Sequence, residues 1–208
     1  MKLYGMQQSR SFRCLWALEE SGLQYEYIPI KLRVNNRDAD SAQNPAYLSI
    51  NAQGKVPSLT DGEMILTESF AILNHIGRNA PESGLLPIGD GKMQAKHDEL
   101  VAFVLTELEQ PLWSKGKHTF ALPEEFQIPK MLDTAKFEFT KAVSALDHLI
   151  SNNEYAIGEK FSIADILLAH TFNWAIRFEF DVPERYVDLR NQHYERPSAK
   201  RALKLAIK

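Results

Sequence analysis

A stretch rich in proline and glycine, residues 80–91 (APESGLLPIGDG), divides this chain into two parts with different hydrophobic periodicity. Before it, short runs with the alternation typical of strands are interleaved with runs that repeat at helical spacing. After it, the apolar residues repeat only at helical spacing. Because proline and glycine concentrate in linkers between domains, the sequence predicts an α/β domain over residues 1–79, a linker over 80–91 and an all-α domain over 92–208.

The first part is expected to fold in the order strand, helix, strand, helix, strand, strand, helix. The strands are expected at residues 2–5, 25–30, 57–60 and 64–67, and the helices at 11–21, 44–50 and 68–79. Gly22 is expected to end the first helix, because glycine readily adopts the left-handed conformation found there. Asp61-Gly62, between two apolar runs, predicts a hairpin turn, and the polar residues 33–43 predict a loop. A β-α-β unit favours a parallel strand pair, so this order indicates a small mixed sheet covered by helices.

The second part is expected to contain three long helices and two shorter ones. The long helices are predicted at residues 92–113, 126–150 and 162–178, and the short ones at 183–190 and 197–207. Ser162 and Asp165 have the spacing of a capping box. In such a box the serine side chain accepts a hydrogen bond from a backbone N–H of the first helical turn, and the acidic side chain accepts one from the backbone N–H of the serine. Phe161 and Ile166 occupy the two positions of a hydrophobic staple around this box.

Composition excludes several classes of partner. The net charge of −3 argues against general nucleic-acid binding, and the apolar run at 163–169 is too short to span a membrane. The chain has one cysteine, Cys14, and its first residues enter a strand directly, so we expect a cytoplasmic protein without an internal disulfide or signal peptide. Six scattered histidines lack metal-ligand spacing, so no metal site is expected.

Three segments of the first part carry candidate chemistry. They are Ser9–Arg13 (SRSFR), Gly54–Pro57 (GKVP) and Thr67–Ser69 (TES). The first and third lie at the starts of predicted helices, where unpaired N–H groups and the helix dipole favour an anion.

These segments resemble those of the glutathione transferases. The similarity extends over LYGMQQSRSFRCLWALEESGLQYEY, NAQGKVPSLTDGEMILTESFAIL and FSIADILLAH, and thus over nearly the whole chain. It implies a thioredoxin-like domain that binds glutathione, followed by an all-helical domain, in a two-fold homodimer. The implied reaction is transfer of the glutathione thiolate to an electrophilic small molecule. The alternatives are a glutathione-dependent peroxidase or disulfide reductase, and a non-catalytic glutathione-binding scaffold.

The resemblance also implies how glutathione is bound. Val56 would pair with the tripeptide through its backbone N–H and C=O, as an added strand does, and Pro57 would be cis. Glu68 would accept a hydrogen bond from the γ-glutamyl ammonium group. Ser69 would donate to the γ-glutamyl carboxylate.

Two further groups of residues complete the expected site. Gln53 and Lys55 are candidates for binding the glycine carboxylate of glutathione. The pocket for the second substrate has four candidate residues, two in the loop before Ser9 and two in the predicted helix 92–113, namely Met6, Gln7, Glu109 and Trp113.

The catalytic requirement is to keep a thiol ionised. A thiol with a pKa of about 8.5 is only about 3% thiolate at pH 7, and one hydroxyl donor near a helix N-terminus is sufficient to raise that fraction. Ser9 is the first choice, because it lies four residues before Arg13, the spacing of the theta-like and phi-like classes. Ser11, which is expected to cap the helix, is the second choice, and Tyr4, which corresponds to the tyrosine of other classes, is the third.

Three positions depart from particular classes of the family. Arg10 stands where beta-class members have cysteine, so a mixed-disulfide mechanism lacks its residue. Gln8 stands where zeta-class members have serine, which argues against isomerisation of that kind. Cys14 lies one turn into the predicted helix and is expected to be buried rather than nucleophilic.

Overall fold

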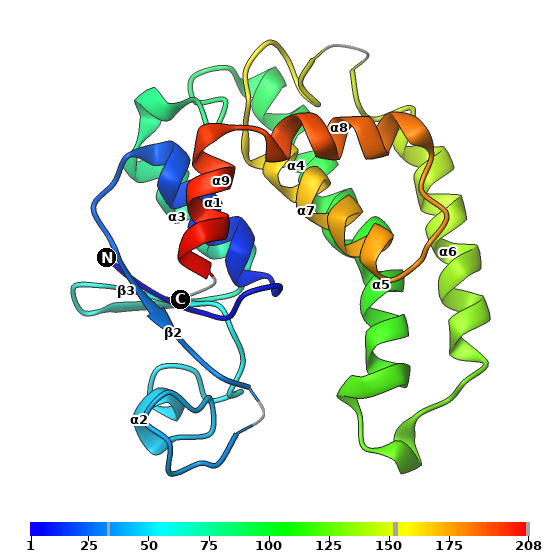
Figure 1. Cartoon of the computed structure of the whole chain (residues 1–208). Helices are drawn as coiled ribbons and strands as arrows, with labels where there is room; N and C mark the ends of the chain where they lie inside the picture. Colours follow the sequence, from blue (N-terminus) through cyan, green and yellow to red (C-terminus); the bar gives the residue numbers. More distant parts are fainter. Residues whose placement is uncertain (33, 152–153, 207–208) are drawn as a thin grey trace. The chain divides into compact units, whose positions relative to one another are not determined.

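The computed structural model describes residues 1–32, 34–151 and 154–206 and divides the chain into two compact units. One unit consists of Met1–Leu86 together with Tyr194–Lys208, and the other of Pro87–His193. The first unit contains a four-stranded sheet with helices, and the regular structure described for the second is helical (Figure 1). This confirms the predicted fold class.

The first unit has the predicted order of elements. They are β1 (Lys2–Gly5), α1 (Ser11–Ser21), β2 (Glu26–Pro29), α2 (Pro45–Leu48), β3 (Ser58–Asp61), β4 (Met64–Thr67), α3 (Ser69–Asn79) and the short 3₁₀ helix η1 (Pro81–Ser83). The strand order is β2-β1-β3-β4. Strand β1 runs parallel to β2 and antiparallel to β3, and β3 runs antiparallel to β4.

The two faces of this sheet are covered by different helices. Figure 1 shows α1 and α3 on one face and α2 on the other. Successive side chains of a strand point to opposite faces, so Leu3 is fully buried while Tyr4 packs against a cluster of Ile30, Ala42 and Tyr47 on the α2 side.

Local signals explain several element ends in this unit. Gly22 ends α1 with a φ of 70°, and the Asn44 side chain caps α2 by accepting a hydrogen bond from Ala46 N at 2.9 Å. The hairpin turn differs by one residue from the prediction: Asp61 pairs with Met64, so the loop residues are Gly62 and Glu63. Gly62 has a φ of 59° and supplies the left-handed conformation that the turn requires. Residue 33 of the predicted loop lies outside the described residues.

The second unit begins with a long helical run interrupted by π-helical turns. It consists of α4 (Gly91–Phe103), η2 (Val104–Leu108), α5 (Glu109–Gly116) and η3 (Lys117–Ala121). Pro111 explains the first interruption, because it has no N–H to donate to the carbonyl group four residues earlier. The prediction of one regular helix over 92–113 was therefore wrong in detail.

The remaining elements of the second unit include the capped helix that the sequence predicted. They are η4 (Glu124–Phe126), α6 (Met131–Leu146), α7 (Ile163–Arg177) and α8 (Glu184–Tyr194), whose last residue belongs to the first unit. Helix α5 packs against α6, and α7 contacts α4 and α5. The capping box at the start of α7 is confirmed, with both Ser162 and Asp165 accepting their expected hydrogen bonds.

The last helix, α9 (Pro197–Ala206), belongs to the first unit and packs against α1. The Glu20 carboxylate accepts hydrogen bonds from Arg196 Nε at 2.7 Å, from Arg196 Nη2 at 3.1 Å and from the Ser198 hydroxyl. Burial alone would raise the pKa of Glu20, but the hydrogen bonds from Arg196, Ser198 and Trp16 hold it below its ordinary value. The sequence placed this helix in a single domain over residues 92–208, whereas in the structure it belongs to the first unit. Its predicted last residue, Ile207, lies outside the described residues.

We expect Arg196→Ala to lower the free energy of unfolding by about 2 kcal/mol, because it leaves the partly buried Glu20 carboxylate without its charged donor. Arg201→Ala is the matched control. Arg201 also pairs with a glutamate of α1, Glu19, but 54% of its side chain is exposed, so a loss of about 0.5 kcal/mol is expected. Urea denaturation of both variants measures the difference, and equal losses would contradict the role given to Arg196.

Candidate functional site

The strand registers bring the three candidate segments to one end of the sheet. Tyr4 of β1 lies opposite Ser58 of β3, and Ser58 lies opposite Thr67 of β4. The residues that follow β1, precede β3 and follow β4 are therefore neighbours. Helix α1 also contacts the start of α3, where the Cys14 thiol donates to the Ser69 carbonyl oxygen at 3.5 Å.

Neither Ser9 nor Ser11 is the N-cap of α1, which is Arg10 and makes no side-chain cap hydrogen bond. The Ser9 hydroxyl oxygen accepts from Ser11 N at 3.1 Å, and it lies 2.6 Å from the Met6 carbonyl oxygen and 2.9 Å from Ser11 Oγ. The expectation that Ser11 provides the cap was therefore wrong. The Ser11 side chain lies next to Gly5 at the end of β1, and its hydroxyl bonds to Met6 N instead of to the helix.

Ser11 is enclosed by the end of β1. Only 1% of the residue is exposed, and its hydroxyl oxygen accepts from Met6 N at 3.2 Å. A Cβ atom on Gly5 would lie 2.6 Å from Ser11 Cβ, so glycine at this position is what allows the serine to lie beneath the strand. Ser9 is only partly buried and is thus the more accessible of the two hydroxyl groups.

Tyr4 has a packing role in this structure. Its ring centroid lies 5.9 Å from that of Tyr47, and the ring packs against the cluster on the α2 face.

The loop that precedes β3 is held from within by two side chains of the α2 region. Tyr47 donates to the Lys55 carbonyl oxygen at 2.6 Å, and Asn51 Nδ2 donates to the same oxygen at 2.9 Å. The Val56-Pro57 peptide bond is cis, as the resemblance implied. Sequence reasoning missed both Tyr47 and Asn51. Asparagine before a tight turn is a usable signal, because its side chain often bonds nearby backbone, but nothing local distinguishes Tyr47.

The remaining candidate residues for glutathione lie on the same loop and at the start of α3. Lys55 Nζ donates to Gln53 Oε1 at 3.0 Å, and both residues are exposed. Ser69 is the first residue of α3 and is 5% exposed. Glu68, just before it, is exposed and has φ 62° and ψ 114°. A side chain in such a sparsely populated region costs about 1–3 kcal/mol, and such strain is concentrated at functional sites.

The candidate residues for a second-substrate pocket differ in exposure. Met6 and Gln7 are partly buried and lie in the loop before Ser9. Trp113 is partly buried, with its ring 6.5 Å from that of Trp174.

Glu109 does not fit the expectation of an open pocket residue. It is 2% exposed, and the hydroxyl of Thr171 on α7 donates to its carboxylate at 3.5 Å. Helix α5 therefore presents this side chain to α7.

Cys14 is buried, as predicted. Its side chain is fully covered, and burial raises the pKa of the thiol to about 12. A thiol with this pKa is protonated at neutral pH and is a poor nucleophile.

The described residues offer neither a metal site nor a membrane-spanning helix. They contain no group of three histidine, cysteine, aspartate or glutamate side chains arranged to hold a metal ion. None of the helices they form is long and apolar enough to cross a membrane.

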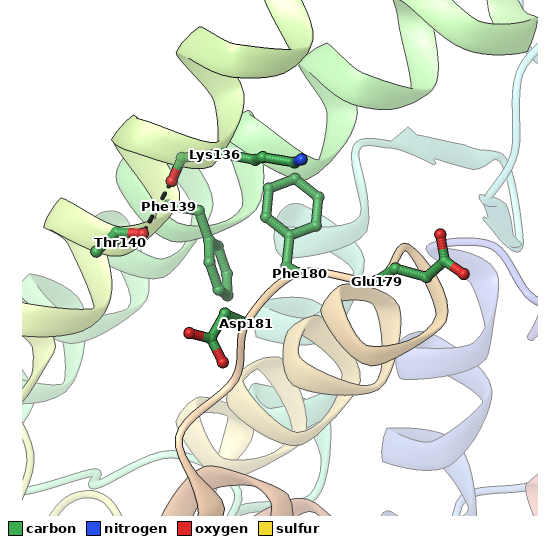
Figure 2. Close-up of a pocket in the computed structure, with 6 residues that line it drawn as sticks. All are labelled: Lys136, Phe139, Thr140, Glu179, Phe180 and Asp181. Atoms are coloured by element: carbon green, nitrogen blue, oxygen red, sulfur yellow. Dashed lines mark hydrogen bonds between the residues drawn. The ribbon is translucent and has the colours of Figure 1, made fainter.

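A hollow of about 280 Å³ lies in the second unit, between α6 and the residues after α7 (Figure 2). Phe139 and Phe180 line it, with ring centroids 4.8 Å apart. Its other lining residues are Lys136, Thr140, Glu179 and Asp181, and the Thr140 hydroxyl donates to the Lys136 carbonyl oxygen. None of the candidate residues lines this hollow.

Comparisons with known proteins agree with this arrangement. The family model described as glutathione S-transferase, N-terminal domain, matches residues 1–78, and that of the C-terminal domain matches residues 110–196. A zeta-class glutathione S-transferase from Euphorbia esula is 30% identical over 188 residues, covering 88% of this chain and 80% of that protein.

Solved structures agree over nearly the whole chain. The glutathione S-transferase of Xylella fastidiosa has a TM-score of 0.83 at 25% identity, covering 99% of this chain and 98% of that one. A sphingomonad glutathione S-transferase complexed with glutathione has a TM-score of 0.80 at 26% identity, with the same coverage.

Proposed function

Because this chain belongs to the glutathione S-transferase family, we propose that it binds reduced glutathione at the end of its sheet and adds the thiolate to an electrophilic carbon. The observation that carries this proposal is the convergence of three segments on one edge: the loop with Ser9, the loop with Val56 and the start of α3. Together they offer a hydroxyl group, a strand-like backbone and a helix N-terminus.

Each segment has a proposed partner in the tripeptide. Val56 provides backbone hydrogen bonds to the tripeptide, as an added strand would. Glu68 accepts from the γ-glutamyl ammonium group, and Ser69 donates to the adjoining carboxylate at the N-terminus of α3, where an anion is favoured. The exposed pair of Gln53 and Lys55 is proposed for the glycine carboxylate.

Ser9 is proposed as the donor to the glutathione sulfur. Its partial exposure supports it over Ser11, which is buried. Both serines lie at the N-terminus of α1, whose N–H groups add positive potential. To donate to the sulfur, the Ser9 hydroxyl must turn its single proton away from the Met6 carbonyl oxygen.

The competing reactions differ in what they require of the protein. A reductase that forms a mixed disulfide needs a reactive protein thiol, and the single cysteine of the chain is buried with a raised pKa. A panel of aryl halides, epoxides, isothiocyanates and organic hydroperoxides distinguishes conjugation from peroxide reduction. If glutathione binds while every compound in the panel is inert, the scaffold alternative replaces the enzyme.

We expect both Glu68→Ala and Glu68→Gly to weaken glutathione binding by about 1.5–3 kcal/mol, the range for a hydrogen bond to a charged group. Only Glu68→Gly relieves the positive φ, so we expect it to be about 1 kcal/mol more stable to unfolding than Glu68→Ala. Calorimetric titration and urea denaturation measure the two effects. Glu63→Ala, at the exposed hairpin turn, is the control and should bind normally, whereas unchanged binding in the Glu68 variants would remove this residue from the site.

The proposal includes a cytosolic two-fold homodimer, the commonest kind of oligomer. Sedimentation at micromolar concentration tests the assembly, since a stable species of 23.7 kDa would be a monomer.

A further inference from the structure

We propose that Tyr47 and Asn51 are positioning residues that set the direction of the Val56 N–H, and so prepare the backbone for the tripeptide. The expected effect on glutathione binding rests on the proposed function. The orientation of the Val56 N–H by these residues does not. Neither residue is among those assigned to contact glutathione, and both are almost fully buried, with 3% and 4% of their surface exposed.

The two side chains converge on one carbonyl group. The Tyr47 hydroxyl lies 2.6 Å and Asn51 Nδ2 lies 2.9 Å from the Lys55 oxygen. The hydroxyl of Ser58, which is fully buried, lies 3.0 Å from the Tyr47 hydroxyl and 3.2 Å from Asn51 Nδ2. Burial raises the pKa of Tyr47, so its phenol keeps its proton at neutral pH and remains a donor. The Lys55 carbonyl is thus held toward the interior by two donors.

The geometry of the peptide unit transmits this constraint. The Lys55 C=O and the Val56 N–H belong to the same planar peptide, and in a trans peptide they point in opposite directions. Fixing the carbonyl toward Tyr47 and Asn51 therefore directs the Val56 N–H away from the interior. Among the residues that the structure describes, this N–H has no acceptor, which leaves it available for an acceptor on a ligand.

Two substitutions remove one donor each with little change in shape. Tyr47→Phe removes the hydroxyl and keeps the ring that packs on Tyr4. Asn51→Asp replaces the amide donor by an oxygen that repels the Lys55 carbonyl, but keeps the Oδ1 atom that accepts from Gln53 N at 3.1 Å. Tyr25→Phe is the matched control, because it removes another hydroxyl of the same unit, which donates to Glu19.

The first measurement is made on the ligand-free protein. The residual dipolar coupling of the Val56 N–H reports the direction of that bond. We expect it to change in Tyr47→Phe and Asn51→Asp while the couplings in β1 and β3 stay as in the wild type, and to be unchanged in Tyr25→Phe. An unchanged Val56 coupling in both variants, or a change spread over the whole sheet, would overturn the proposal.

The second measurement is glutathione affinity with kinetics. We expect the dissociation constant and the KM for glutathione to rise about 10-fold in Tyr47→Phe, and at least as much in Asn51→Asp, with kcat at saturating glutathione within two-fold of the wild type. Tyr25→Phe should lose stability without losing affinity. Wild-type affinity in both variants would overturn the proposal. If the wild type itself does not bind glutathione, the proposed function fails, and the dipolar couplings still decide whether these residues orient the peptide.

Discussion

Ser9→Ala should raise the pKa of the thiol of bound glutathione by about one to two units, whereas Ser11→Ala should leave it nearly unchanged. The expected shift corresponds to the loss of one hydrogen bond to a charged acceptor, about 1.5–3 kcal/mol. Ser11 is 1% exposed beneath Gly5 and already bonds to Met6 N, so it cannot reach a ligand without leaving that place. The absorbance of the bound thiolate against pH measures both variants.

Stability measurements separate this catalytic role from the structural role of Ser9, whose hydroxyl accepts from Ser11 N. Ser9→Ala removes the acceptor of Ser11 N and should cost about 1 kcal/mol, and Ser11→Ala removes the acceptor of Met6 N and should cost a similar amount. Both variants should therefore unfold at a lower temperature than the wild type, but only Ser9→Ala should raise the pKa of the glutathione thiol. A pKa shift in Ser11→Ala alone would transfer the role to Ser11. No shift in either would indicate Tyr4 or the backbone N–H groups of α1.

Asp165→Ala should lower the free energy of unfolding by about 3–5 kcal/mol. Asp165 is fully buried, and its two oxygens accept from Ala156 N at 2.8 Å, Ser162 N at 2.8 Å and the Ser162 hydroxyl at 3.0 Å. Its removal leaves these buried donors without an acceptor, at about 1–3 kcal/mol each. It also removes half of the capping box of α7. Urea denaturation measures the loss.

Asp90→Ala is the control for this prediction. Asp90 also caps a helix, α4, by accepting from Lys92 N and Met93 N, both at 3.0 Å, but it is exposed. Water replaces an exposed cap, so a loss of about 1 kcal/mol is expected. Equal losses in the two variants would contradict the importance given to the buried donors.

The cost of Asp165→Ala should depend on pH. Burial raises the pKa of Asp165 from 3.8 to about 6 in spite of the three donors, and His193 Nε2 lies 3.6 Å from its carboxylate. Since the folded-state pKa lies above the unfolded one, this carboxyl group stabilises the fold most below about pH 4, and that contribution is lost as the pH rises to about 6. The difference between wild type and Asp165→Ala should thus be larger at pH 5 than at pH 8, and a difference that grows with pH would contradict this.

Particular residues show how far sequence reasoning reaches into the site. Val56, Glu68 and Ser69 were selected through a family resemblance, and the strand registers place their segments together. Tyr47 and Asn51 were missed, because the group they hold is a backbone carbonyl, which has no signature in the sequence. The prediction of Ser11 as the helix cap was wrong, because Ser11 is the first residue of α1 and its hydroxyl accepts from Met6 N instead. What distinguishes Ser11 from Ser9 is its burial next to Gly5, and this contact depends on how the chain folds rather than on a local sequence pattern.

The sequence by itself determined the strands and main helices of this protein and their order, because hydrophobic period, proline and glycine positions and capping residues act within a few residues of one another. The tertiary structure alone decided which unit holds the last helix and which side chains hold the loop around Val56. Arg196 binds Glu20 across 176 residues, and Tyr47 reaches Lys55 from another element. Such contacts form only when packed elements bring distant groups within hydrogen-bonding distance, so no local pattern specifies them.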